Sequence, residues 1–263
     1  MENLTPDQFK SWKQNGYLHL KHYFDTKATS QIQDWTEEMA SWPETPGRWM
    51  KWFESSANDR ANRLLCRMED FLPYHEGYRQ LLTDKTLLGM LSDLMGEKAV
   101  LFKEKINFKL PGGSGFKAHQ DAPAFVTFNQ TFHITMMVAI DPATIENGCL
   151  EMVPGLHQRG ILPQAADGTL DPNFSNTLTW EPVEMDAGDV LFFDSYIPHR
   201  SAENRSTRPR RAAYITYNRL SEGECRDDYF RHKREVFPPE IERIPGVKLS
   251  DAAKIYNLGN PID

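Results

Sequence analysis

The feature that most constrains the fold is a change in the character of the sequence at about residue 99. From there to about residue 217, short segments of alternating apolar and polar residues are separated by turns rich in Gly and Pro. Successive side chains of a strand leave opposite faces, so this alternation predicts β-strands. We expect strands over residues 100–110, 134–140, 150–153, 189–194 and 211–217, and one more that carries residues 119–121.

The part before residue 99 is predicted to be mainly helical. Thr5-Pro6-Asp7-Gln8 has the pattern of a helix cap, and apolar residues recur at helical spacing over residues 26–41 and 78–95. A short strand is expected over residues 16–20. Helices followed by a run of short strands predict an α+β, mainly β domain built around a β-barrel or jelly roll.

No stretch of the chain has the composition of a linker, so we expect one domain over residues 1–263. Its parts are a helical N-terminal part to about residue 98, a barrel over about 99–220 and a C-terminal extension over about 221–263. Residues 155–180 contain no long periodic segment and are expected to form a surface loop over the mouth of the barrel.

Charge and cysteine content limit the possible partners. The net charge is −7 and the pI is about 5.7, which argues against a general nucleic-acid or anionic-membrane partner. No apolar run approaches the ~20 residues of a membrane span, and the first residues do not resemble a signal peptide. Three cysteines, Cys66, Cys149 and Cys225, without a Cys-x-x-Cys pair indicate reduced thiols. We therefore expect a cytoplasmic protein.

His119-Gln120-Asp121, taken with His199, predicts a metal centre. In a strand, His119 and Asp121 leave the same face, and a turn after an apolar strand can aim His199 toward them. Two imidazoles and one carboxylate on one face of a metal are typical of non-haem Fe(II) oxygenases. A His-x-Asp triplet alone often occurs by chance, and the other six histidines are interpreted as surface or packing residues.

Arginines follow His199 closely. Any of them can form a two-pronged, charge-assisted pair with a carboxylate, and a solvated basic turn is the alternative. Spacing alone does not choose among Arg205, Arg208, Arg210 and Arg211.

Together these residues resemble the phytanoyl-CoA dioxygenase family of Fe(II)- and 2-oxoglutarate-dependent oxygenases. The resemblance covers nearly the whole chain. Four segments and the N-terminal stretch 9–20 carry it. The first segment joins residues 109–113 to 119–122, the second joins 138–141 to 146–150, the third is 153–157, and the fourth runs from 188–192 to 198–199.

The resemblance implies a double-stranded β-helix, which is a jelly-roll or cupin-like barrel, with N-terminal and flanking helices. It implies Fe(II) held by His119, Asp121 and His199, with 2-oxoglutarate and O₂ as co-substrates. It assigns the far carboxylate of 2-oxoglutarate to Arg210, eleven residues after His199, with Ser201 beside it. It also places Lys105 near 2-oxoglutarate, and Met137 where relatives often carry Trp.

The substrate is expected to be small, polar and anionic. Lys105, Asn107, Lys117 and Arg67 are predicted to form a cationic pocket for a phosphonate or carboxylate, and solvated strand edges are the alternative. Residues 48–54, 65–69 and 102–107 resemble bacterial members of the family that hydroxylate 2-aminoethylphosphonate at the carbon next to phosphorus, in phosphonate catabolism.

For the amine of such a substrate, the candidate partners are Asp70, Glu69 and Trp49. Two alternatives remain open at this point. One is a hydroxylase of another small metabolite or of an acyl-thioester, and the other is a catalytically silent barrel that binds a ligand.

Overall fold

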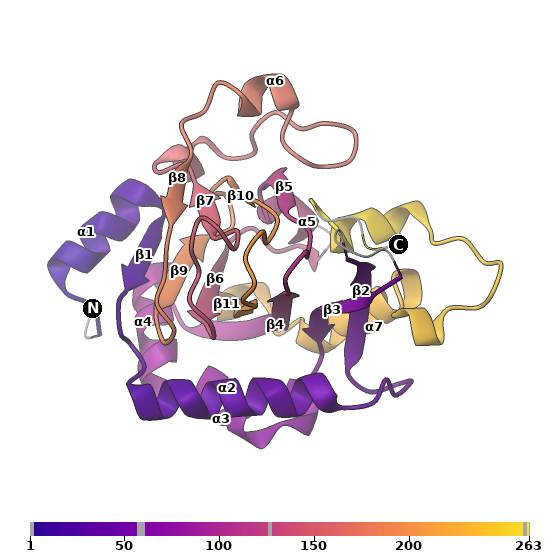
Figure 1. Cartoon of the computed structure of the whole chain (residues 1–263). Helices are drawn as coiled ribbons and strands as arrows, with labels where there is room; N and C mark the ends of the chain where they lie inside the picture. The colour runs from indigo at the N-terminus through magenta and orange to yellow at the C-terminus, as the bar shows by residue number, and fades with distance from the viewer. Residues whose placement is uncertain (1–2, 57–60, 126–127, 260–261, 263) are drawn as a thin grey trace.

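The computed structural model describes residues 3–56, 61–125, 128–259 and 262, and in it two antiparallel sheets face each other (Figure 1). The strands are β1 (Tyr17–Leu20), β2 (Met50–Ser55), β3 (Arg63–Glu69), β4 (Ala99–Lys109), β5 (Phe116–His119), β6 (His133–Ala139), β7 (Leu150–Met152), β8 (Glu181–Val183), β9 (Val190–Asp194), β10 (His199–Ser201) and β11 (Arg210–Arg219). The larger sheet has the order β1-β9-β6-β11-β4-β3-β2, and the smaller has the order β5-β10-β7-β8. The expected α+β class with antiparallel strands is confirmed.

Helices surround the sheets. They are α1 (Pro6–Asn15), α2 (Thr26–Ser41), α3 (Glu76–Leu82), α4 (Lys85–Met95), α5 (Ala122–Phe125), α6 (Pro172–Ser175) and α7 (Arg226–Val236), with 3-10 turns η1 (Leu72–Tyr74), η3 (Leu156–Arg159), η4 (Leu220–Glu222), η5 (Glu240–Glu242) and η6 (Asp251–Tyr256). The predicted cap at Thr5 is confirmed as a capping box with Gln8. Figure 1 shows α2 and α3 beneath the larger sheet, and α7 with the C-terminal segment beside β2 and β3. None of the described helices has the length and apolar character that a membrane span requires.

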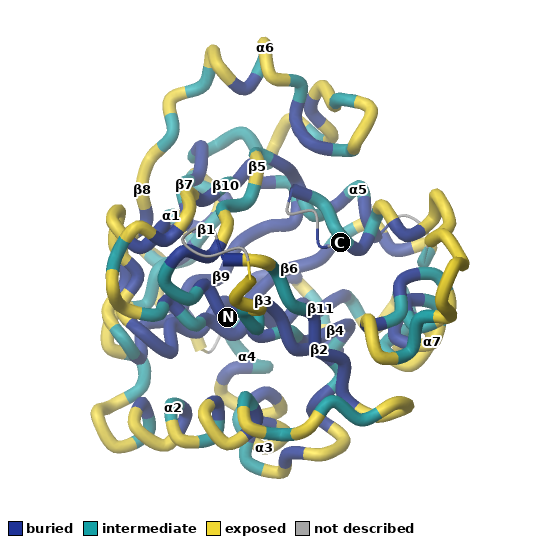
Figure 2. Tube along the Cα trace, turned by 45° about the vertical axis from the view of Figure 1, so that its right-hand side comes forward, coloured by how far each residue is buried: buried dark blue, intermediate teal, exposed yellow. Residues whose placement is uncertain are grey.

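Alternation along the central strands separates a structural face from a functional face. On β4, Ile106 and Phe108 pack with α2, α3 and α4 in a large apolar cluster. Lys105 and Asn107 alternate with these two residues along the strand, and they face the space between the sheets, where the functional pocket lies. The strand period of two therefore buries one face under helices and leaves the other available for chemistry. Figure 2 shows that the strands are largely buried, whereas α2 exposes its outer face.

The C-terminal extension closes one side of the larger sheet. Trp52 of β2 and Phe102 of β4 share an apolar cluster with Tyr229, Phe237 and Tyr256 of the extension. Buried aromatic side chains supply large contact areas, so this cluster attaches the extension firmly to the sheet.

The part before residue 99, which was expected to be mainly helical, contains α1 to α4 and also the strands β2 and β3, which the sequence did not predict. Short apolar runs fit a helix or a strand equally well, and position in the fold decides between them. Here β3 pairs with β4, with Arg67 opposite Asn107, and β2 pairs with β3. This pairing extends the larger sheet and places Arg67 beside the pocket.

Candidate metal centre and active site

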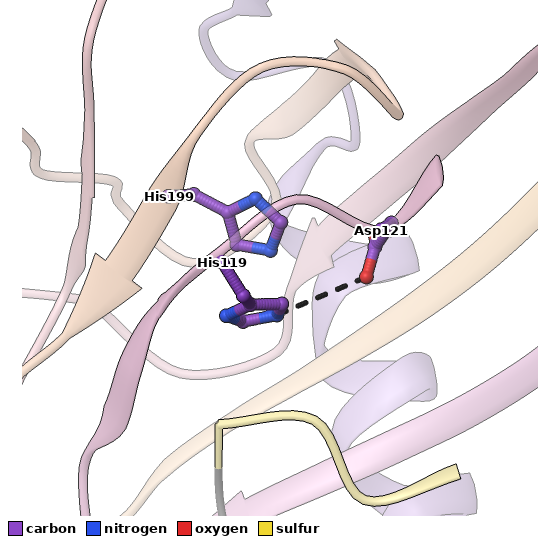
Figure 3. A group of neighbouring side chains, drawn as sticks. All are labelled: His119, Asp121 and His199. Carbon is purple, nitrogen blue, oxygen red and sulfur yellow. Dashed lines mark ion pairs between the residues drawn. The ribbon is translucent and has the colours of Figure 1, made fainter. Parts of the chain in front are cut away.

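His119, Asp121 and His199 come together at one end of the smaller sheet. His119 ends β5 and His199 begins β10, and the two residues lie opposite each other in the register, with ring centroids 4.3 Å apart. One ligand atom from each of the three side chains lies within 4.8 Å of the others. Figure 3 shows both rings and the carboxylate converging, with His119 Nε2 at 3.8 Å from Asp121 Oδ1.

Backbone carbonyls fix the orientation of both rings. His119 Nδ1 lies 2.7 Å from the carbonyl oxygen of Lys117, and His199 Nδ1 lies 3.1 Å from that of Ile197. Because a carbonyl can only accept, each Nδ1 carries the proton and donates it. The Nε2 lone pairs remain available to a metal, which is the usual arrangement around metal-binding histidines.

Electrostatics favour the protonation states that a metal needs. Burial and the neighbouring His199 lower the pKa of His119 to about 3, and burial also lowers the pKa of His199. Burial raises the pKa of Asp121, but attraction to His199 and Lys103 outweighs it and leaves that pKa below its ordinary value. Two neutral imidazoles and a carboxylate fit Fe(II) and leave coordination positions for other ligands.

A pocket extends from the three residues into the space between the sheets, and we call it the sheet lobe. Its lining is Lys103, Lys105, Asn107, Phe116, His119, Asp121, Thr135, Leu150, Phe193, His199, Ser201, Tyr214 and Thr216.

Arg210 lies next to the sheet lobe and retains an unused donor. It is 1% exposed, and its Nη2 donates to the Tyr214 hydroxyl at 3.1 Å. Within the described part of the chain its Nε has no hydrogen-bond partner. Ser201 Oγ accepts a hydrogen bond from Lys109 Nζ at 2.7 Å. The hydroxyl proton of Ser201 therefore remains available for donation to a ligand. A buried guanidinium with a spare N–H is suited to a carboxylate, and so is the hydroxyl of Ser201, which lines the sheet lobe.

A second pocket adjoins the first, and we call it the C-terminal lobe. It shares Lys103, Lys105, Phe116, His119 and Asp121 with the sheet lobe. Its other lining residues come from β3, α5 and the C-terminal extension, and they are Arg67, Glu69, Ala124, Tyr229, Lys233, Ile255, Tyr256 and Leu258.

The C-terminal lobe has more cations than anions. Glu69 Oε2 accepts from Lys233 Nζ at 2.5 Å, and both residues are almost fully buried. The side-chain ammonium groups of Lys103 and Lys105 form no hydrogen bond or ion pair with any residue that the structure describes. Burial, followed by repulsion from Lys103, lowers the pKa of Lys105 to about 7. Buried cations without anionic partners are costly, so the lobe is suited to an anionic ligand.

The structure brings Arg67, Asn107 and Lys105 to the lobes, as predicted, but not Lys117. Lys117 is exposed and pairs with Asp167 at 3.3 Å. The cause is a bulge, because between the pairs 119–199 and 116–201 two residues of β5 oppose one residue of β10. The extra residue breaks the alternation, so the lobes are lined by Phe116 and His119 and not by Lys117. Met137 is fully buried among apolar residues and lines neither lobe.

Of the three candidates for an amine partner, only Glu69 lines a lobe. Asp70 pairs with Arg226 at 2.9 Å, and Trp49 packs against Trp42. Sequence reasoning missed Lys233, Tyr229 and Tyr256 because the C-terminal extension has no motif that relates it to the metal residues. It also passed over Lys103, although strand alternation places Lys103 on the same face as Lys105.

A family model described as phytanoyl-CoA dioxygenase (PhyH) matches residues 12–212. A 2-aminoethylphosphonate dioxygenase from uncultured bacterium HF130_AEPn_1 is 53% identical over 262 residues, covering 100% of both chains. A methylphosphonate hydroxylase from Gimesia maris (strain ATCC 29201 / DSM 8797 / 534-30) is 43% identical over 257 residues, covering 98% of this chain and 95% of the relative.

Solved structures show the same fold at low sequence identity. EctD from S. alaskensis, determined with 2-oxoglutarate and 5-hydroxyectoine, has a TM-score of 0.72 and 18% identity, covering 84% of this chain and 78% of EctD. The epimerase SnoN, in complex with Fe³⁺, alpha ketoglutarate and nogalamycin RO, has a TM-score of 0.67 and 18% identity, covering 98% and 94%. These likenesses confirm the expected jelly-roll fold of the Fe(II)/2-oxoglutarate oxygenases. The chain therefore belongs to the phytanoyl-CoA dioxygenase family, whose enzymes use Fe(II), 2-oxoglutarate and O₂.

Proposed function

We propose that this chain hydroxylates 2-aminoethylphosphonate at the carbon next to phosphorus, with release of succinate and CO₂. The observation that carries the proposal is the cationic C-terminal lobe, which adjoins the His119–Asp121–His199 centre. The full-length relative at 53% identity, a 2-aminoethylphosphonate dioxygenase, supports the same substrate.

The charge balance of the C-terminal lobe fits a phosphonate. Four cationic side chains line it, against the two carboxylates of Glu69 and Asp121, which leaves a surplus of two positive charges (4 − 2). The phosphonate dianion of 2-aminoethylphosphonate offsets that surplus, and its ammonium group restores one positive charge. Arg67, Lys103 and Lys105 are the donors that we assign to it, because charge-assisted hydrogen bonds to anions are strong and directional.

The sheet lobe is assigned to 2-oxoglutarate. Arg210 and Ser201 bind its far carboxylate, and Lys105 lies where the two lobes meet. His119, Asp121 and His199 would hold Fe(II), which with 2-oxoglutarate and O₂ supplies the oxidising chemistry that inserts oxygen into a C–H bond. The protein positions both ligands in lobes that adjoin the metal residues.

Methylphosphonate is a second candidate substrate, and it is favoured by the relative at 43% identity. It offers the same anionic group to Arg67, Lys103 and Lys105. A long acyl-thioester fits less well, since its chain needs an apolar groove and the C-terminal lobe is lined largely by charged residues and tyrosines.

The test is turnover of 2-aminoethylphosphonate by the purified protein, loaded with Fe(II) and 2-oxoglutarate under anaerobic conditions and then exposed to O₂. We expect succinate and a 1-hydroxy product, seen as a new phosphorus NMR signal, in equal amounts. His199→Ala should abolish both products. Succinate without a new phosphorus species, or no reaction with either phosphonate, would contradict the proposal.

We also propose that the protein works in the cytoplasm as a single domain and that its partner is the small-molecule substrate. Cys66, Cys149 and Cys225 are free thiols, which suits a reducing compartment. The net charge of −7 gives no general attraction to nucleic acid.

A further inference from the structure

Glu69 is the one carboxylate, apart from the metal-site Asp121, that lines either lobe in the described part of the chain. It lies on β3 and is 1% exposed. Its Oε2 accepts from Lys233, but no described residue donates a hydrogen bond to its Oε1. Arg67 Nη1 forms an ion pair with Oε1 at 3.7 Å, which is beyond hydrogen-bond distance. Oε1 is therefore an acceptor without a donor beside the proposed substrate site.

The chemistry of the proposed ligands shows which group can donate a hydrogen bond to Glu69 Oε1. Because Glu69 lines the C-terminal lobe, a ligand there that supplies an N–H or O–H can donate to Oε1. 2-Oxoglutarate offers only acceptors, and so does a phosphonate dianion. An ammonium group at the other end of the substrate offers three donors and a positive charge. Burial raises the pKa of Glu69, but attraction to Lys233 and Arg67 outweighs it, so the carboxylate remains ionised.

The surroundings of Glu69 already stabilise one ammonium group. Lys233 Nζ lies 4.6 Å from the ring centroid of Trp52, 5.3 Å from that of Tyr256 and 5.9 Å from that of Tyr229. The two tyrosines also line the C-terminal lobe, so a second ammonium beside Glu69 meets the same aromatic faces. Glu69 and the rings of Tyr229 and Tyr256, which all line the lobe, are chemically suited to a cationic group.

We propose that Glu69 determines specificity by accepting hydrogen bonds from the substrate ammonium at Oε1, while Arg67, Lys103 and Lys105 hold the phosphonate. This assignment rests on the proposed function. It predicts that the enzyme discriminates between a phosphonate that ends in an ammonium group and one of the same shape that ends in a methyl group. Lys233 has the supporting role of orienting Glu69 through Oε2.

The experiment compares 2-aminoethylphosphonate with n-propylphosphonate, in which a methyl group replaces the ammonium. We measure kcat/KM by succinate release and Kd by anaerobic calorimetry with the protein loaded with Fe(II) and 2-oxoglutarate. The wild type should prefer the amine by about 10-fold or more. In Glu69→Gln that preference should fall by roughly 10- to 100-fold, the usual worth of a hydrogen bond to a charged group.

The matched control is Glu104→Gln. Glu104 is another fully buried carboxylate that pairs with an arginine, Arg226, but it lines neither lobe. Its variant should keep the wild-type preference. If thermal melting shows that Glu69→Gln does not fold, the double variant Glu69→Gln/Lys233→Met removes both buried charges together, and the same loss of preference is expected.

The possible results separate the two proposals. If the wild type uses both phosphonates equally well, or if Glu69→Gln keeps the wild-type preference, the role of Glu69 is refuted and the proposed function stands. If the wild type neither binds nor converts either phosphonate, the proposed function fails, and the role of Glu69 fails with it.

Discussion

At the residue scale, Arg210 is the clearest test of the co-substrate assignment. Arg210→Gln should raise the Kd for 2-oxoglutarate by about 30-fold or more, because it removes a buried charge that is proposed to pair with a carboxylate. Anaerobic calorimetric titration measures this change. The control is Arg211→Gln, whose native side chain pairs with Asp141 and Glu37 on the other face of β11. A wild-type Kd for Arg210→Gln would contradict the assignment.

The same scale shows what strand spacing can predict. The period of two placed Lys105 and Asn107 on the functional face. The expected strand over residues 119–121 is wrong in its extent, because β5 ends at His119 and the bend that follows brings Asp121 to the metal site. The period of two failed for Lys117 because the bulge in β5 adds a residue, and nothing in the local sequence marks that bulge. Choosing Arg210 among four arginines required family resemblance, since burial and an unused donor become visible only in three dimensions.

At the element scale, the C-terminal segment supports β5 directly behind a metal-site residue. Lys117 N–H donates to the Gly259 carbonyl at 2.8 Å, and a Cβ added at Gly259 would lie 3.1 Å from His119 Nδ1. Gly259→Ala should therefore displace the His119 ring and weaken Fe(II) binding by about 10-fold. Anaerobic Fe(II) titration measures the affinity.

Gly246→Ala provides the matched control for this prediction. Gly246 has φ +81° against +79° for Gly259, so both substitutions introduce the same backbone strain. A Cβ at Gly246 meets no atom within 4 Å. Equal Fe(II) affinities in the two variants would show that contact with His119 does not matter.

Pairing between distant segments explains why some elements were harder to predict. The apolar runs of β2 and β3 acquire strand structure from the edge of β4, and the C-terminal lobe exists only because α7 and η6 return to β3. Lys233 reaches Glu69 across 164 residues of sequence, a separation over which no periodicity operates. Local patterns therefore predicted the metal centre better than the substrate pocket.

At the scale of the whole molecule, the C-terminal extension shares an apolar cluster with β2 and β4, so it should unfold together with the sheets. Phe237 is 2% exposed and stacks on Trp52 with ring centroids 6.0 Å apart. Phe237→Ala should lower the free energy of unfolding by about 3–5 kcal/mol, through lost burial and the cavity left behind.

Denaturant unfolding, followed by circular dichroism and by tryptophan fluorescence, measures that loss. Both signals should change in one coincident transition, because Trp52 belongs to the shared cluster and the sheets cannot keep their packing without it. Ile244→Ala is the control within the same extension. Ile244 is 70% exposed, so its variant should stay within about 0.5 kcal/mol of the wild type. Two separate transitions would mean that the extension folds independently, and the C-terminal lobe would then lose one of its walls before the sheets unfold.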